Sequence, residues 1–284
     1  MSIKADKKMN FNSIKLAAID LDGTLLNDDK KLCDGAKEAI SQAHSRGIHI
    51  VPITGRPYLG VPDFVKALPE VEYLITSNGA QIIDKHTKNS LFSFAISNEK
   101  SRAIMEVLRG FDCLYEPFCD GVGYSEQHIY DFYMRHFTGT VLEEYFTSSR
   151  KICSGYDEIF KDGSKCADEF FVTCPDEKTR SALMSEVEKI GDIQFCTHRD
   201  KFLEISEKGT DKGAALRVIC AHLGIDIKNT VAFGDGENDI PLLKAAGIGI
   251  AMGNSEAPLL NFADCTAKTN NENGVAEILK RCSA

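Results

Sequence analysis

Short apolar runs alternate with amphipathic stretches through the first third of the chain. Residues 34–46 place alanine and isoleucine at helical spacing, and Gly47 directly afterwards predicts the end of that helix. Buried strands are expected at three mostly apolar runs: 14–19, 48–53 and 71–75. This order of strand, helix and strand predicts right-handed crossovers and a parallel sheet.

The last third of the chain repeats the same alternation. Strands are expected at 230–233 and 248–252, and helices at 212–223, 239–246 and 274–280. Both ends of the chain therefore predict α/β structure of one kind. The simplest arrangement is a single parallel-sheet domain to which both ends contribute.

The middle of the chain has a different pattern. Period-2 segments such as 92–96 and 169–172 stand beside helical stretches such as 178–190, without regular alternation. This irregular order favours an α+β module. The fold class that we expect is therefore α/β, with a Rossmann-like parallel-sheet core and an inserted α+β domain.

The composition narrows the class of protein. Of the 284 residues, 43% are hydrophobic, which is enough for a sizeable core. Acidic residues outnumber basic ones, and the net charge of −9 argues against a nucleic-acid binder. The ten cysteines include no Cys-x-x-Cys pair, so we expect reduced thiols and neither a zinc nor a redox motif.

No stretch approaches the roughly 18–20 apolar residues that a membrane span requires. We therefore expect a cytoplasmic protein without a nucleic-acid or membrane partner, and the sequence indicates no obligate protein partner. A small phosphorylated substrate is compatible with the negative charge, because a few local cations and a metal reverse the sign inside a pocket.

Two carboxylates follow the first predicted strand. Asp20 and Asp22 are two residues apart, so in an extended chain they project from the same side. Two close carboxylates repel each other unless a cation joins them, and Gly23 permits a sharp turn of the backbone above the site. The run predicts a magnesium-assisted acidic site at the C-terminal edge of a parallel sheet. The alternative is an ordinary polar turn.

Other predicted strands also end in polar side chains. Thr54-Gly55-Arg56 offers a hydroxyl and backbone amides for a phosphate oxygen, and an arginine for a substrate anion. Asn78 follows the third strand. The loop from Gly234 to Asp239 follows the strand at 230–233 and adds three acids and the amide of Asn238. The alternative for the loop from Gly234 to Asp239 is a surface turn, which its two glycines would favour.

Lys212 opens the helix predicted at 212–223. A lysine is unfavourable at the positive end of a helix dipole unless it faces an anion, although a solvated lysine is the common case. Taken together, the loops place carboxylates, a hydroxyl, a lysine and an amide at the ends of predicted parallel strands. That combination is much more specific than any one loop.

These runs resemble the haloacid dehalogenase superfamily of phosphohydrolases, and most of all its Cof-type sugar-phosphatase branch with an inserted type IIB cap. The matching runs occur in both terminal thirds in the expected order: Asp20-Leu21-Asp22-Gly23-Thr24, Thr54-Gly55-Arg56, Ser77-Asn78-Gly79-Ala80, Glu204-Ile205 leading to Lys212-Gly213, Gly234-Asp235-Gly236-Glu237-Asn238-Asp239, Ala251-Met252-Gly253-Asn254 and Asn273-Gly274-Val275. The middle third matches only in length and mixed character. The resemblance implies a core of residues 1–81 and 204–284 and a substrate-specificity cap of residues 82–203.

The resemblance also implies a role for each candidate residue. Asp20 would attack phosphorus and form an aspartyl-phosphate, and Asp22 would protonate the leaving alkoxide and then activate water. Mg²⁺ would be held by Asp20, the backbone carbonyl of Asp22, and Asp235. Asp239 would orient these ligands from outside the coordination sphere. The residues implied to bind substrate or phosphate are Thr54, Gly55, Arg56, Asn78, Lys212 and Asn238.

The function implied is a magnesium-dependent phosphomonoester hydrolase of small phosphorylated metabolites, sugar phosphates first. One alternative is a phosphomutase or phosphotransferase that passes the phosphoryl group of the aspartyl-phosphate to another hydroxyl. The other is a non-catalytic module that binds a phosphorylated ligand. The acid–base residue Asp22 argues against a binding module, because binding alone needs no acid or base.

Overall fold

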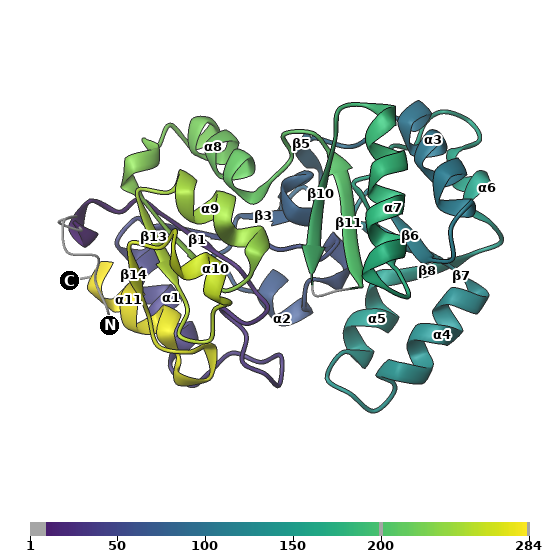
Figure 1. Ribbon diagram of the computed structural model, residues 1–284. Helices are drawn as coiled ribbons and strands as arrows, with labels where there is room; N and C mark the ends of the chain where they lie inside the picture. The colour runs from purple at the N-terminus through teal and green to yellow at the C-terminus, as the bar shows by residue number, and fades with distance from the viewer. Residues whose placement is uncertain (1–9, 199–200, 283–284) are drawn as a thin grey trace. The chain divides into compact units, whose positions relative to one another are not determined.

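Strands and helices from both ends of the chain build the first of two structural units. The computed structural model describes residues 10–198 and 201–282 (Figure 1). The first unit contains the described residues up to Thr54, together with Asp63–Leu91 and the residues from Asp211 onward. The second unit contains Gly55–Pro62 and Phe92–Thr210.

A parallel five-stranded sheet forms the centre of the first unit. Its order is β14-β13-β12-β1-β2. These strands are β14 (Cys265–Thr266), β13 (Ile248–Ala251), β12 (Thr230–Gly234), β1 (Leu16–Ile19) and β2 (His49–Pro52). Every residue of β1, β12 and β13 is buried, which explains why these strands read as unbroken apolar runs. The predicted α/β class and its parallel core are confirmed.

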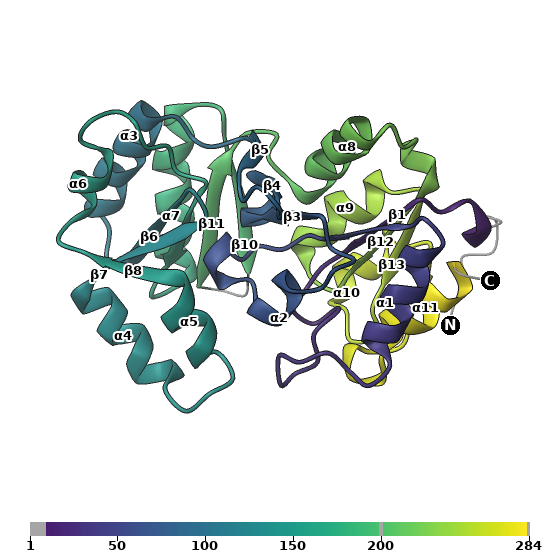
Figure 2. The same cartoon turned by 180° about the vertical axis from the view of Figure 1, so that it is seen from behind.

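Helices cover both faces of this sheet. Helices α1 (Ala36–Ser45) and α11 (Gly274–Cys282) pack side by side on one face. Helices α8 (Lys212–Leu223) and α9 (Ile240–Ala245) pack together on the other (Figures 1 and 2). Gly213 permits their close approach, because a Cβ there would lie 2.3 Å from the carbonyl oxygen of Pro241. Two shorter helices, α2 and α10, span Asp63–Lys66 and Ala257–Leu260.

The strand predicted at 71–75 forms the start of a second, smaller sheet. Its order is β3-β4-β5, with β3 at Tyr73–Thr76, β4 at Gln81–Asp84 and β5 at Ser90–Ser93. Isolated parallel bridges, Ile50 to Val71 and Ile53 to Ile75, connect this region to β2 and the residue after it. The period-2 segment predicted as a strand at 92–96 thus contributes only its first two residues to a strand.

A six-stranded mixed sheet forms the second unit, in the order β10-β11-β9-β6-β7-β8. The strands are β6 (Leu114–Cys119), β7 (Val122–Glu126), β8 (Arg150–Cys153), β9 (Glu169–Thr173), β10 (Ile193–His198) and β11 (Phe202–Glu207). The helices are α3 (Asn98–Arg109), α4 (Gln127–Phe137), α5 (Glu143–Ser149), α6 (Tyr156–Phe160) and α7 (Glu177–Val187). Within the described residues of this sheet, β7 and β8 pair in parallel, and the other neighbouring strands pair antiparallel. The predicted α+β character is confirmed.

Adjacent phenylalanines on β9 show how the helices share the two faces of this sheet. Phe170 stacks on Phe160 of α6, with ring centroids 6.4 Å apart. Phe171 faces Tyr133 of α4 at 6.5 Å. Because successive side chains of a strand point to opposite faces, α4 and α6 lie on opposite sides of the sheet.

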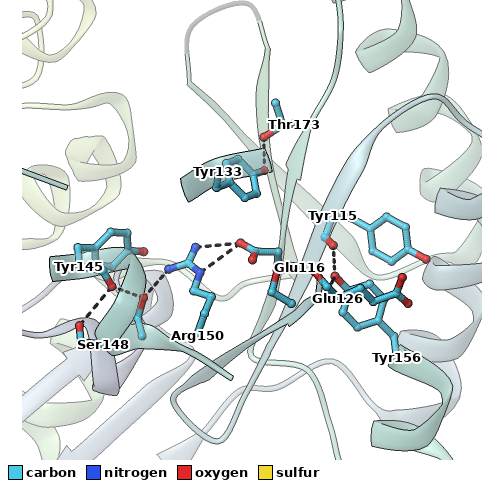
Figure 3. Close-up of polar contacts among 11 residues, drawn as sticks. Tyr115, Glu116, Glu126, Tyr133, Tyr145, Ser148, Arg150, Tyr156 and Thr173 are labelled. Atoms are coloured by element: carbon cyan, nitrogen blue, oxygen red, sulfur yellow. Dashed lines mark hydrogen bonds and ion pairs between the residues drawn. The ribbon is translucent and has the colours of Figure 1, made fainter. Parts of the chain in front are cut away.

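A buried ion pair joins two strands of the second unit. Nε and Nη2 of Arg150 donate to Oε2 of Glu116 at 3.2 and 3.1 Å, and both side chains are almost wholly buried. Figure 3 shows Arg150 between Glu116 and Tyr145. The rings of Phe118, Tyr145 and Phe146 lie within 4.9 Å of the guanidinium carbon. The charge is therefore held by a carboxylate and by aromatic faces.

The unit boundaries lie elsewhere than the sequence predicted. Residues 82–91 group with the first unit because β4 pairs with β3. Residues 204–210 group with the second because β11 pairs with β9 and β10. Gly55–Pro62 also groups with the second unit, and there the Leu59 amide donates to the Gly121 carbonyl at 3.0 Å. No described helix is long and apolar enough to cross a membrane.

Candidate active site

The carboxyl ends of β1 and β12 bring two aspartates to one edge of the sheet. The two strands are parallel neighbours, and the amide of Asp20 donates to the carbonyl of Phe233 at 3.1 Å. Asp20 and Asp235 follow these strand ends directly. Gly23 is required between them, because it has φ +76° and an added Cβ would lie 2.2 Å from Oδ2 of Asp235. Both aspartates therefore lie at the carboxyl edge of the parallel sheet.

Lys212 is the cation of this cluster. It is the first residue of α8, and its side chain is 1% exposed. Its Nζ donates to Oδ1 of Asp20 at 2.8 Å and to Oδ1 of Asp239 at 2.6 Å. Burial alone would lower the pKa of Lys212, but the charges of the two carboxylates outweigh it and raise that pKa. Lys212 is therefore a permanent cation beside Asp20.

Asp239 holds the loop after β12 in place. While its Oδ1 accepts from Lys212, its Oδ2 accepts from the backbone amides of Asp235 at 2.9 Å and Gly236 at 3.1 Å. Gly234 makes room for it, since a Cβ at that position would lie 2.4 Å from the side chain of Asp239. Both carboxylate oxygens of Asp239 therefore accept hydrogen bonds, one from Lys212 and the other from the loop that carries Asp235.

Negative charge accumulates at the cluster. Asp20, Asp235 and Asp239 each have a carboxylate oxygen within 4.8 Å of those of the other two. Burial, followed by the charges of Asp239 and Asp235, raises the pKa of Asp20 well above its usual range, although Lys212 opposes the rise. Burial and the charge of Asp239 raise the pKa of Asp235 to about 7. Three carboxylates against one lysine, with only oxygen donors, fit a hard divalent cation.

Asp22 lies apart from these three carboxylates. Its Oδ1 pairs with Nζ of Lys30 at 2.8 Å, and its side chain is 36% exposed. The sequence placed Asp22 on the same side as Asp20, but its carboxylate is not in the acidic cluster. The Asp22 side chain is therefore partly exposed and lies outside the group of carboxylates that could hold a metal ion.

Two of the predicted phosphate-binding residues are joined directly. Nδ2 of Asn238 donates to Oδ1 of Asn78 at 3.0 Å. Thr54 is buried and connects to Asn78 through the backbone, since the Asn78 amide donates to the Thr54 carbonyl at 3.1 Å. Gly55 and Arg56, by contrast, group with the second unit. There, Nη1 of Arg56 donates to the carbonyl of Gly60 at 2.8 Å.

Sequence reasoning gave no role to two further residues of the site. Thr24 donates its hydroxyl to Oδ1 of Asp235 at 3.0 Å. Asn254 donates to the carbonyl of Gly23 at 2.8 Å and accepts from the amide of Asn270 at 3.0 Å. Both belong to runs that carried the family resemblance, but only the fold shows which groups they contact.

Comparisons with known proteins agree with this arrangement. The family described as haloacid dehalogenase-like hydrolase matches residues 17–279. The chain is 29% identical to the 5-amino-6-(5-phospho-D-ribitylamino)uracil phosphatase YcsE of Bacillus subtilis (strain 168), over 94% of this chain and 95% of that protein. The structure of a haloacid dehalogenase-like hydrolase from B. subtilis superposes with a TM-score of 0.82 and 27% identity, covering 94% of this chain and 99% of the other.

A subclass IIB sugar phosphatase shares the fold with a TM-score of 0.78 and 20% identity, covering 94% of this chain and 98% of that one. The second unit is thus an inserted cap of the same subclass. The chain belongs to the haloacid dehalogenase-like hydrolases, in the branch of phosphatases that carry a subclass IIB cap.

Proposed function

We propose that this phosphatase is a magnesium-dependent phosphomonoester hydrolase that works through an aspartyl-phosphate on Asp20. The observation that carries the proposal is the buried contact of Lys212 with Asp20 at 2.8 Å. The lysine engages Oδ1 of Asp20, so Oδ2 is the oxygen that attacks phosphorus. A fixed cation beside the nucleophile also offsets the repulsion between a carboxylate and a phosphoryl group.

In the first step, a bond forms between Asp20 and phosphorus while the bond from phosphorus to the substrate oxygen breaks. Asp22 donates a proton to the departing alkoxide. In the second step, Asp22 takes a proton from water, which attacks phosphorus and releases inorganic phosphate and Asp20. The partly exposed position of Asp22, beside Lys30, supports a group that exchanges protons with substrate and water.

The phosphoryl group would be bound by Thr54, Lys212 and Asn238, with the Gly55 amide and Arg56 as further candidates. The divalent cation would be held by Asp20, Asp235 and the backbone carbonyl of Asp22, with Asp239 fixing the loop of Asp235. When bound, Mg²⁺ neutralises charge on the phosphoryl oxygens and on the attacking carboxylate. The cluster contains three carboxylates and one lysine, and this excess of negative charge supports a bound divalent cation.

The substrates proposed are small phosphorylated metabolites, with sugar phosphates first. The subclass IIB relative of the same fold is described as a sugar phosphatase. The B. subtilis relative is described as acting on a phosphoribityl pyrimidine, in which the phosphate sits on a sugar alcohol. Both descriptions share a polyol phosphate, which is the chemistry that we assign to the substrate here.

A phosphate-release assay tests the proposal. The protein is stripped with EDTA, supplied with Mg²⁺ or Ca²⁺, and offered hexose phosphates, pentitol phosphates, nucleoside monophosphates and phosphoserine without an acceptor alcohol. We expect release with Mg²⁺ only, and highest kcat/KM on a polyol phosphate. Release that requires an added acceptor would indicate a phosphotransferase, and release without any divalent metal would contradict the cation site.

A further inference from the structure

The turn after β3 is strained, and the proposed reaction does not explain why. Ser77, Asn78 and Gly79 have φ values of +47°, +52° and +104° in succession. Positive φ is unfavourable for serine in particular. Oγ of Ser77 is also buried without a hydrogen-bond partner among the described residues. The positive φ of Ser77 and its buried, unpaired hydroxyl both cost stability. Such costs persist at one turn when other contacts fix the position of that turn.

This turn contacts three parts of the candidate site. The amide of Asn78 donates to the carbonyl of Thr54 at 3.1 Å. A Cβ at Gly79 would lie 2.6 Å from the carbonyl oxygen of Asp211, the residue before Lys212. The side chain of Asn78 accepts from Asn238 at 3.0 Å. The turn therefore touches the segments that carry the three proposed phosphoryl-binding residues.

The contact between Asn78 and Asn238 determines the orientation of the Asn238 side-chain amide. Nδ2 of Asn238 lies against Asn78, and Oδ1 lies on the side of Gly236, where an added Cβ would be 2.9 Å away. An amide nitrogen carries two N–H groups. One donates to Asn78, and the second is left for another acceptor. Without Oδ1 of Asn78, the amide loses the contact that distinguishes its nitrogen end from its oxygen end.

We propose that Asn78 is a positioning residue that presents the second N–H of Asn238 to the phosphoryl group and does not itself contact substrate. The inference rests on the proposed function, which supplies the phosphoryl group. Asn78 is only 8% exposed, and its Oδ1 is already engaged. An oxygen atom aimed at an anion would repel it, whereas the same oxygen behind Asn238 orients a donor.

A double-mutant cycle tests this inference. Glycine keeps the positive φ of the turn, so Asn78→Gly removes the side chain without adding backbone strain. Asn78→Gly, Asn238→Ala and the double variant are compared with wild type by calorimetric binding of inorganic phosphate with Mg²⁺ and by kcat/KM. We expect Asn78→Gly to weaken phosphate binding about tenfold in wild type, and less than about twofold when Asn238 is already alanine.

Asn273→Gly is the matched control. Asn273 also has positive φ, at +61°, and its Nδ2 donates to the carbonyl of Asp34 at 2.8 Å, but it contacts none of the proposed phosphate-binding residues. We expect phosphate affinity to match wild type there. Effects of Asn78→Gly and Asn238→Ala that multiply would mean that Asn78 binds phosphate itself, and the inference would be wrong. A lower Tm with unchanged phosphate affinity would also overturn it, because the role would then be structural.

Phosphate is a probe of the site that does not depend on turnover. The two substitutions could prove non-additive in phosphate binding while the protein hydrolyses no phosphate ester. That result would support the role of Asn78 and contradict the proposed hydrolase function. Wild-type protein that binds no phosphate in the presence of Mg²⁺ would overturn both.

Discussion

The guanidinium carbon of Arg56 lies 4.6 Å from the centre of the Tyr145 ring. The same ring is faced by Arg150 at 4.9 Å, so two arginines share one aromatic side chain. The Glu116 carboxylate neutralises one of these charges, and the Gly60 carbonyl accepts from the other. The segment that follows Thr54 directly is thus fastened inside the cap, although the sequence predicted that Arg56 would sit with the core.

Close backbone packing reinforces that attachment. A Cβ at Gly60 would lie 2.6 Å from the Tyr145 ring, and a Cβ at Gly121 would lie 2.6 Å from that of Tyr58. The Leu59 amide also donates a hydrogen bond to the carbonyl of Gly121. Together these contacts make Gly55–Pro62 part of the cap's own structure. The chain therefore passes between core and cap at four points along the sequence: 54/55, 62/63, 91/92 and 210/211.

Arg56→Met is expected to loosen this segment. The substitution keeps an apolar stem but removes the bond to Gly60 and the cation–π contact with Tyr145. Amide exchange at Leu59 should speed up roughly tenfold, because local opening becomes cheaper by about 1–2 kcal/mol. Hydrogen–deuterium exchange of the peptide covering 55–62 measures this directly.

Arg109→Met is the control for that experiment. Arg109 also pairs with carboxylates in the cap, but its side chain is 36% exposed. Exchange at 55–62 should match wild type in this variant. Equal exchange in Arg56→Met and wild type would mean that Arg56 does not hold the segment, and its guanidinium would be available for the substrate contact that the sequence predicted.

Asp20→Asn is expected to abolish turnover without unfolding the protein. Asparagine nearly keeps the shape of the side chain but removes the attacking charge, so kcat should fall at least roughly a thousandfold. Tm should change little, because burying the Asp20 carboxylate itself costs stability and Lys212 keeps its ion pair with Asp239. Phosphate release and thermal unfolding are the measurements. The exposed Asp29→Asn serves as control, and activity of Asp20→Asn within tenfold of wild type would refute the nucleophile assignment.

The sheet and its acidic edge were predictable because the information is local. Each residue of 14–19 and 230–233 reflects burial at its own position, and a carboxylate next to a buried strand must lie at a sheet edge. The unusual lysine at the start of α8 was also recognisable, since the helix dipole makes its anionic surroundings necessary. The structure places Lys212 against Asp20 and Asp239, as that reasoning requires.

Contacts between distant segments could not be predicted in this way. Asn78 and Asn238 are 160 residues apart and have no periodicity in common. Glu116 and Arg150 look like ordinary surface charges in the sequence but are buried against each other. Arg56 follows the Thr54 run in sequence, yet its partners come from residues 60 and 145. Only the tertiary fold determines such pairs.

Lys212→Met is expected to destabilise the core strongly. The substitution leaves the buried carboxylates of Asp20 and Asp239 without their shared cation, and breaking a buried pair in this way costs about 3–5 kcal/mol. Urea unfolding in EDTA at pH 7.5 measures the free energy of unfolding. Lys161→Met removes an exposed lysine that pairs with Glu158, and it should leave this free energy nearly unchanged.

The loss in Lys212→Met should shrink as the pH falls. Burial raises the pKa of Asp20, so its protonation removes one of the buried charges that Lys212 balances, and less uncompensated charge remains at low pH. A cost that stays the same from pH 7.5 to pH 5, or one that is as small as in Lys161→Met, would mean that Lys212 does not balance the carboxylates. Addition of Mg²⁺ at pH 7.5 should also recover part of the stability, because a bound cation substitutes for the missing lysine charge.

The metal-free protein is expected to lose stability as the pH rises from 5 to 7. The pKa of Asp235 is raised to about 7 by burial and by Asp239, from 3.8 for the unperturbed group. Between these values the folded state holds a proton that the unfolded chain has released, so the free energy of unfolding falls with rising pH. Asp20, whose pKa is raised for the same reason, adds to the trend. Above pH 7 Asp235 is ionised in both the folded and the unfolded state, so it lowers the free energy of unfolding no further.

Thermal unfolding in EDTA across this range measures the effect, and we expect Tm to drop on the order of 5 °C. Asp235→Asn should flatten the decline, because the amide has no proton to lose. Asp226→Asn is the control: the pKa of Asp226 is lowered by its hydrogen bonds to Lys228, so it does not titrate in this window. Mg²⁺ should raise Tm more at pH 8 than at pH 5 in wild type, since ionised carboxylates bind it. An equal effect of Mg²⁺ at both pH values, or a wild-type Tm that rises from pH 5 to 7, would contradict the charge balance assigned to this cluster.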